Sequence, residues 1–129
     1  MKMHKIVALV DDAVSKPYEY GTNDCNIIVL KLLDLMVGTD YLSLAEGKYK
    51  TLQGGLRLFK KNDFKDLEDM VSRHCEVVDR PILGDIYLNG INASVFLHNT
   101  MLQINYEHNQ FYVSQIPEEL EGKIYRIRK

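Results

Sequence analysis

A polar turn that leads directly into a long apolar segment constrains this chain more than any other feature. Asn23 and Asp24 are both residue types that cap helix N-termini, and Cys25 follows them at once. From residue 27 to residue 37 only two charged residues interrupt the apolar run. A helix that is apolar on almost every side is a buried helix. We therefore expect a central buried helix over about residues 25–37, with Cys25 in its first turn.

The rest of the chain divides into a helical first part and a strand-rich last part. Apolar spacing predicts further helices at about residues 3–15, after Thr51 and after Asn62-Asp63, with one helical turn at 42–46. After Pro81, turn residues separate five short β-like runs at residues 82–88, 91–97, 100–106, 110–116 and 123–127. This order predicts an α+β fold in which N-terminal helices pack on one C-terminal antiparallel β-sheet.

Size and composition indicate a single globular domain over residues 1–129, with 46% apolar and 26% charged residues. The net charge of −2 argues against nucleic acid as a partner. No stretch approaches the roughly 18 apolar residues of a membrane span, and the N-terminus lacks a signal-peptide pattern. We therefore expect a protein made in the cytoplasm, without a Cys25–Cys75 disulfide. We expect no metal or other cofactor, because Cys and His do not occur in pairs with ligand spacing.

The position of Cys25 has two interpretations. A thiol at a helix start feels the positive end of the helix dipole, which would lower its pKa and favour the nucleophilic thiolate. The alternative is a small buried apolar residue at a helix start, which is common in its own right. Cys75 follows Arg73-His74 and precedes Glu76-Val77-Val78, and we interpret it as a structural thiol near a helix-to-strand transition, without a set of charges that would activate it.

Two motifs carry a resemblance to a known family. Pro17-Tyr18-Glu19-Tyr20-Gly21 ahead of Asp24-Cys25 resembles the nucleophile region of the NlpC-type cell-wall peptidases, and Gly84-Asp85-Ile86 resembles the stretch that opens their sheet. The likeness is closest to a shorter, mostly phage-encoded branch, which shares a Gly-x-Tyr segment such as Gly47-Lys48-Tyr49. The resemblance implies a papain-like fold and a cysteine peptidase or amidase that acts on peptidoglycan stem peptides. It also implies production in the bacterial cytoplasm and a place in a phage tail or virion.

The base that such an enzyme needs is not where the resemblance predicts it. By register, Asn92 stands where the family has its histidine, and an amide cannot accept and return a proton near neutral pH. Gln103 and Asn105 are the candidates for the third polar position. Among the four histidines, His108 is the one whose turn the predicted topology brings toward Cys25. The alternative for His108 is a solvent-exposed loop residue.

The remaining predictions concern the substrate cleft and the competing functions. We expect Tyr18, Tyr20 and Asp24 to line a substrate cleft; the alternative is that the two rings pack over the helix end. Asp85 is expected to accept backbone hydrogen bonds at a strand start. The alternative to a hydrolase is a catalytically inactive papain-like scaffold that serves as a phage virion or tail component or binds a host protein. A third hypothesis is acyl transfer or deamidation at Cys25.

Overall fold

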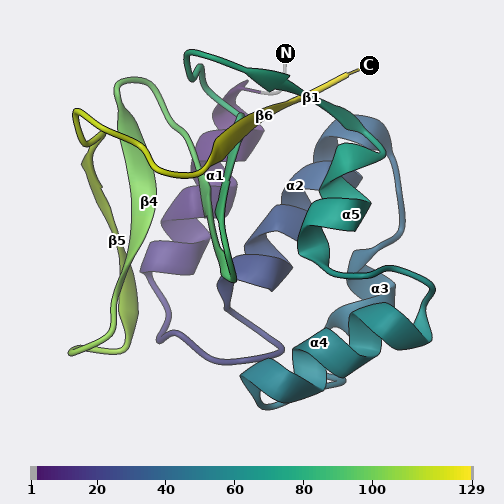
Figure 1. The fold of residues 1–129 in the computed structure, drawn as a ribbon. Helices are drawn as coiled ribbons and strands as arrows, with labels where there is room; N and C mark the ends of the chain where they lie inside the picture. The colour runs from purple at the N-terminus through teal and green to yellow at the C-terminus, as the bar shows by residue number, and fades with distance from the viewer. Residues whose placement is uncertain (1–2, 129) are drawn as a thin grey trace.

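The structure is a computed structural model that describes residues 3–128, and it has α+β architecture (Figure 1). The helices are α1 (Met3–Val14), α2 (Cys25–Val37), α3 (Leu42–Ala45), α4 (Leu52–Lys61) and α5 (Leu67–Ser72). The strands are β1 (Cys75–Val78), β2 (Ile86–Asn89), β3 (Asn92–Val95), β4 (Thr100–Asn105), β5 (Gln110–Gln115) and β6 (Lys123–Ile127).

The central helix forms as the sequence predicts. Asp24 caps the start of α2, where its side chain accepts a hydrogen bond from the Ile27 N–H. Gly38 ends the helix in the left-handed conformation, with φ 87°, and its N–H donates to the Asp34 carbonyl. The apolar side chains between these caps are almost fully enclosed, Leu30 and Leu33 among them. The prediction of a buried central helix is therefore confirmed.

The other helices agree with the predictions except at one boundary. Helix α1 ends at Val14, three residues before Pro17, and Thr51 caps α4 by accepting from the Gly54 N–H at 2.9 Å. Helix α5, however, begins after Asp66 rather than after Asn62-Asp63, and the Asp66 side chain accepts from the Asp69 N–H. Within residues 3–128, no helix is both long and apolar enough to cross a membrane.

The strands form two sheets instead of the one that we predicted. The larger sheet is antiparallel with the order β1-β6-β2-β3, and β4 and β5 form a separate two-stranded sheet. Strand β1 begins at Cys75, where we predicted a helix-to-strand transition but no bounds for a strand. This strand is four residues long and, within residues 3–128, pairs with β6 alone; Cys75 is its buried residue. A short edge strand of this kind leaves little alternation for a sequence pattern to detect.

The predicted hairpin of residues 92–97 and 100–106 opens soon after its turn. Its two strands meet at one bridge, Phe96 with Met101, and at the hydrogen bond from the Leu97 N–H to the Thr100 carbonyl. Further on, the Ser94 hydroxyl donates to the Leu102 carbonyl, so a side chain occupies that acceptor. Strand β4 pairs with β5 instead, and this hairpin packs beside α1 (Figure 1).

Candidate functional site

Asp24 organises the start of α2 through three hydrogen bonds. Its carboxylate accepts from the Ile27 N–H at 2.8 Å, the Gly21 N–H at 2.8 Å and the Tyr49 hydroxyl at 2.6 Å. The residue is 1% exposed. These contacts fix the backbone on both sides of Cys25. The prediction that Asp24 lines a substrate cleft is therefore wrong, because protein donors enclose its carboxylate.

The turn before Cys25 and the Gly47-Lys48-Tyr49 segment form one structural unit. Gly21 has φ 88°, and its carbonyl accepts from the Gly47 N–H at 2.8 Å. A Cβ on Gly21 would lie 2.0 Å from the Tyr49 carbonyl oxygen, so only glycine fits here. In α4, a Cβ on Gly55 would lie 3.1 Å from the Tyr49 ring. The two glycines thus let Tyr49 approach closely enough to reach Asp24.

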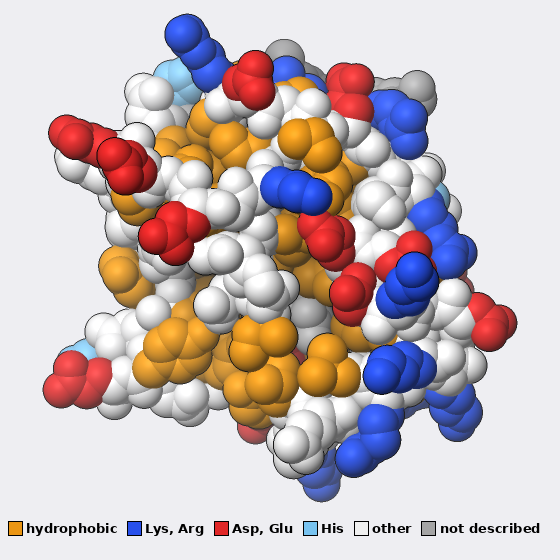
Figure 2. Space-filling view, viewed as in Figure 1, with side chains coloured by type: hydrophobic (Ala, Val, Ile, Leu, Met, Phe, Trp, Pro, Cys, Tyr) orange, Lys and Arg blue, Asp and Glu red, His pale blue; other side chains and the backbone are white. Residues whose placement is uncertain are grey.

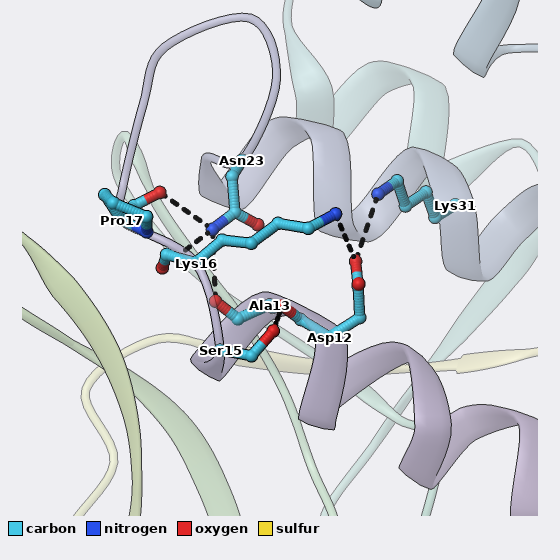
Figure 3. A network of polar contacts seen from close by, with 7 residues as sticks. All are labelled: Asp12, Ala13, Ser15, Lys16, Pro17, Asn23 and Lys31. Atoms are coloured by element: carbon cyan, nitrogen blue, oxygen red, sulfur yellow. Dashed lines mark hydrogen bonds and ion pairs between the residues drawn. The ribbon is translucent and has the colours of Figure 1, made fainter.

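Asn23 ties the end of α1 to the start of α2 (Figure 3). Its side-chain N–H group donates to the carbonyls of Ala13 at 3.1 Å, Lys16 at 3.3 Å and Pro17 at 3.0 Å. Nearby, the Asp12 carboxylate forms ion pairs with the ammonium groups of Lys16 at 3.1 Å and of Lys31 at 3.9 Å. This network holds the turn between the helices, and with it the position of Cys25.

The Cys25 thiol lies among hydrogen-bond donors in a largely enclosed place. The residue is 8% exposed. Its sulfur accepts hydrogen bonds from the Tyr18 hydroxyl at 3.9 Å and from the backbone N–H groups of Ala93 and Asn26. Burial raises the pKa of the thiol, and the negative charge of Asp24 raises it further. The hydrogen bonds lower the pKa but do not outweigh these two causes. The prediction of a lowered pKa is therefore wrong, and the thiol stays protonated at neutral pH.

Of the two tyrosines of the turn, Tyr18 lies next to the thiol and Tyr20 packs on Tyr18. Burial, and next the charge of a Cys25 thiolate, hold the pKa of Tyr18 far above its ordinary value, so its hydroxyl remains a donor. The Tyr18 ring packs edge-on against Tyr20, with 5.6 Å between ring centres, and at 5.1 Å against Phe111. Tyr18 thus both contacts the thiol and packs over the helix end.

The residue of β3 that meets the thiol is Ala93. Its backbone N–H donates to the sulfur. Asn92, the exposed first residue of β3, accepts a hydrogen bond from the Tyr106 hydroxyl through its Oδ1 at 3.0 Å. The place of Asn92 at the position of the catalytic histidine stays a prediction.

Tyr106 is a member of the site that the sequence analysis missed. Its ring is 69% exposed, yet burial and the nearby Cys25 and Tyr20 raise the pKa of its hydroxyl. Its position directly before the predicted turn at residues 107–109, the turn that carries His108, is the sequence feature that could have identified it. It lines a hollow of about 190 Å³ together with Asn92 and Gln103. Gln103 is therefore near Asn92, but the contacts of the thiol are made by other residues.

His108 lies on a turn that does approach the site. The next residue, Asn109, is bonded twice to Tyr18: its carbonyl accepts from the Tyr18 N–H at 2.8 Å, and its side chain donates to the Tyr18 carbonyl at 3.0 Å. His108 itself is exposed, and its backbone N–H donates to Asn105 Oδ1 at 3.2 Å. The turn is thus where the topology predicts, while the role of the imidazole as a base stays a prediction.

The other three histidines lie elsewhere. His4 and His98 are exposed on α1 and on the turn before β4. His74 Nε2 lies 2.6 Å from the Tyr41 hydroxyl, far along the chain from the motif. Over residues 3–128, no group of three or more His, Cys, Asp or Glu side chains is placed to hold a metal ion.

Asp85 accepts a backbone hydrogen bond as predicted, and it also pairs with Arg126, which was not predicted. Its carboxylate accepts from the Ile82 N–H at 2.9 Å, which confirms the predicted backbone bond at a strand start. It also pairs with the Arg126 guanidinium, whose Nη2 lies 2.8 Å from Oδ2. The pair links the start of β2 to β6.

A second, larger groove lies on the α5 side of the β2–β3 turn and has a volume of about 300 Å³. Its lining comes from α4, α5 and the β2–β3 turn, together with Asn26 of α2. Because the Asn26 N–H also reaches the Cys25 sulfur, the groove and the thiol share a residue. We call it the α4–α5 groove.

Comparison with known proteins gives one relationship. The model of a family described as a domain of unknown function (DUF6950) matches residues 2–108, from α1 through the β4–β5 turn. The match includes the Cys25 turn, the Gly47-Lys48-Tyr49 segment and the β2–β3 hairpin. Searches of curated proteins and of solved structures gave no match. Because the family match covers most of the chain, the protein belongs to the DUF6950 family.

Proposed function

We propose that this protein is a non-hydrolytic binding domain on a papain-like scaffold, which recognises a peptide segment of another protein. The observation that carries the proposal is the state of the Cys25 thiol. Burial and the charge of Asp24 raise its pKa, and its contacts are the Tyr18 hydroxyl and two backbone N–H groups. All three contacts donate hydrogen bonds, and none of them takes a proton.

Nucleophilic attack by a thiol needs a neighbouring group that accepts the thiol proton and later returns it. On β3, the group that meets the thiol is the Ala93 backbone N–H, which donates a hydrogen bond and takes no proton. Tyr18 is the side chain in contact, and its raised pKa keeps it a donor. The chemistry of these neighbours favours retention of the site for its shape and hydrogen bonds rather than for turnover.

The papain-like part of the proposal rests on the assembled motif. The start of α2, the Tyr18 ring and the Asp24–Tyr49 hydrogen bond bring together the residues that resemble the NlpC-type nucleophile region. The phage-encoded branch of that resemblance suggests a virion or tail component, or a phage protein that binds a host protein. The exposed apolar and polar surfaces around the α4–α5 groove give such a partner a place to bind.

A second candidate function is a cysteine peptidase or amidase that acts on peptidoglycan stem peptides. The anchoring of the β4–β5 turn to Tyr18 favours it, because this contact holds His108 on the same side of the molecule as the thiol-bound tyrosine. In that case Cys25 attacks the amide carbonyl, His108 takes the thiol proton, and the Tyr18 hydroxyl donates to the oxyanion. The imidazolium of His108 then protonates the leaving amine as the C–N bond breaks, and water hydrolyses the thioester to release the acid and regenerate the thiol.

Turnover of purified peptidoglycan fragments separates the two candidates. The binding proposal predicts no release of peptides by the wild-type protein above the level of Cys25→Ser, at any pH at which both remain folded. His108→Ala should likewise change nothing. Release that disappears in Cys25→Ser and falls in His108→Ala would overturn the binding proposal and establish the hydrolase.

A further inference from the structure

The α4–α5 groove combines an apolar floor with an acidic rim. The following residues line it: Asn26, Leu52, Leu56, Phe59, Asp66, Leu67, Glu68, Leu88, Gly90, Ile91 and Asn92. In Figure 2, hydrophobic side chains gather between the β2–β3 turn and α4, and acidic side chains lie beside them over α5. Ile91, at the tip of the turn, is 60% exposed. An apolar side chain held out in this way is available to a ligand.

The charges of the rim are only partly neutralised. Glu68 Oε2 accepts from the Tyr125 hydroxyl at 2.7 Å and lies 4.0 Å from the ammonium of Lys123. The Lys123 side chain is 64% exposed, so this pair is weak. Asp66 uses one oxygen, Oδ1, to accept from the Asp69 N–H at 2.9 Å, and its side chain is exposed. The rim thus presents two carboxylates against one loosely held cation.

We propose that this groove binds an extended peptide segment of a partner protein in which an aliphatic residue is followed by a lysine or arginine. The aliphatic side chain packs on Leu56 and Leu67, and the cationic one reaches Asp66 and Glu68. This inference rests on the proposed binding function and names its ligand class. Charge complementarity with the rim selects a cationic partner, and the 300 Å³ volume has room for one aliphatic side chain.

Occupation of the groove has a consequence at the thiol. Asn26 lines the groove, and its backbone N–H donates to the Cys25 sulfur. A bound peptide therefore lies against the residue that directly follows Cys25. We expect the peptide to slow alkylation of Cys25 and to leave alkylation of Cys75, which is buried on β1, unchanged.

Titration of the isotopically labelled full chain with blocked tetrapeptides tests the proposal by NMR. The probe is acetyl-Ala-Leu-Lys-Ala-amide, compared with analogues in which Glu replaces Lys or Ser replaces Leu. The lysine peptide should shift the amide signals of Leu56, Leu67 and Ile91. Replacement of Lys by Glu should weaken binding by about fivefold or more, the factor that corresponds to about 1 kcal/mol for an exposed charge pair. Replacement of Leu by Ser should also weaken binding, because the apolar contact is lost.

Two double variants are compared. The first pair of substitutions is Asp66→Asn and Glu68→Gln, and the second pair, which is the control, is Glu118→Gln and Glu119→Gln. The first pair keeps the α5 cap and an acceptor for Tyr125 while it removes the two rim charges. The second pair removes two exposed charges from the loop before β6. Only the first should abolish the preference for lysine over glutamate. Equal binding of the two peptides to the wild-type protein, or an unchanged preference in the folded first variant, would overturn the proposal.

The same titration with Cys25→Ser separates this inference from the proposed function. Charge-dependent binding by Cys25→Ser, together with cleavage of peptide by the wild-type protein, would refute the non-hydrolytic function and leave the groove assignment standing. Absence of charge-dependent binding in a protein that also lacks turnover would refute the groove assignment alone.

Discussion

Replacement of Tyr49 by phenylalanine tests how the fold positions Cys25. The Tyr49 hydroxyl donates to Asp24 at 2.6 Å, and both residues are buried. The substitution leaves the carboxylate with two donors, the N–H groups of Gly21 and Ile27. Hydrogen bonds to charged groups contribute roughly 1.5–3 kcal/mol, and we expect a loss of about 2 kcal/mol in the free energy of unfolding.

Urea melts at neutral pH measure this loss, with Tyr112→Phe as the control. Tyr112 lies on the exposed side of β5, and its replacement should change the free energy of unfolding by less than about 0.5 kcal/mol. The Tyr49 variant should also have a still higher Cys25 pKa, because the charge of Asp24 is then less neutralised. A Tyr49→Phe protein as stable as the control would show that this hydrogen bond does not hold the start of α2.

Three further predictions concern the core, the turn and the pH dependence of stability. Leu33→Ala, in the fully buried part of α2, should cost about 2–5 kcal/mol in denaturant melts, and a cost under about 0.5 kcal/mol would contradict its place in the core. Gly21→Ala should destabilise the protein and perturb the NMR signals of Tyr49, because a Cβ would collide with the Tyr49 carbonyl; unchanged spectra would refute the close contact. Burial raises the pKa of Cys75 to about 11, so the stability it contributes is present below the pKa of the unfolded thiol and is lost as pH rises through about 11. Cys75→Ala should therefore flatten the fall in stability above about pH 8.5, and an unaltered fall would argue against this cause.

The main helices could be predicted because their signals are local. The α2 cap, its apolar run and Gly38 all lie within one stretch of sequence. The pairing of strands could not be predicted in the same way, because it depends on contacts between distant segments. The Ser94 hydroxyl of β3 donates a hydrogen bond to the Leu102 carbonyl of β4, at a point where the two strands belong to different sheets.

The candidate site was predicted in its outline but not in its long-range contacts. Tyr18 and Cys25 are neighbours in sequence and in space. The backbone N–H of Ala93, however, reaches the thiol from a distant segment of the chain, and such a contact leaves no local pattern in the sequence. The Asp24–Tyr49 hydrogen bond joins residues 25 positions apart. In the sequence this contact is indicated by the glycines near Tyr49, namely Gly47, Gly54 and Gly55.

Ionisation of Cys25, followed directly by NMR, tests the central claim that the thiol is held neutral. In a Cys75→Ser protein labelled with ¹³C at the cysteine Cβ, one signal reports the protonation of Cys25 without depending on access by a reagent. The account predicts a single transition above the ordinary thiol pKa of about 8.5, unchanged in His108→Ala. A transition below about pH 7, or one that moves when His108 is removed, would show an activated nucleophile and contradict the account.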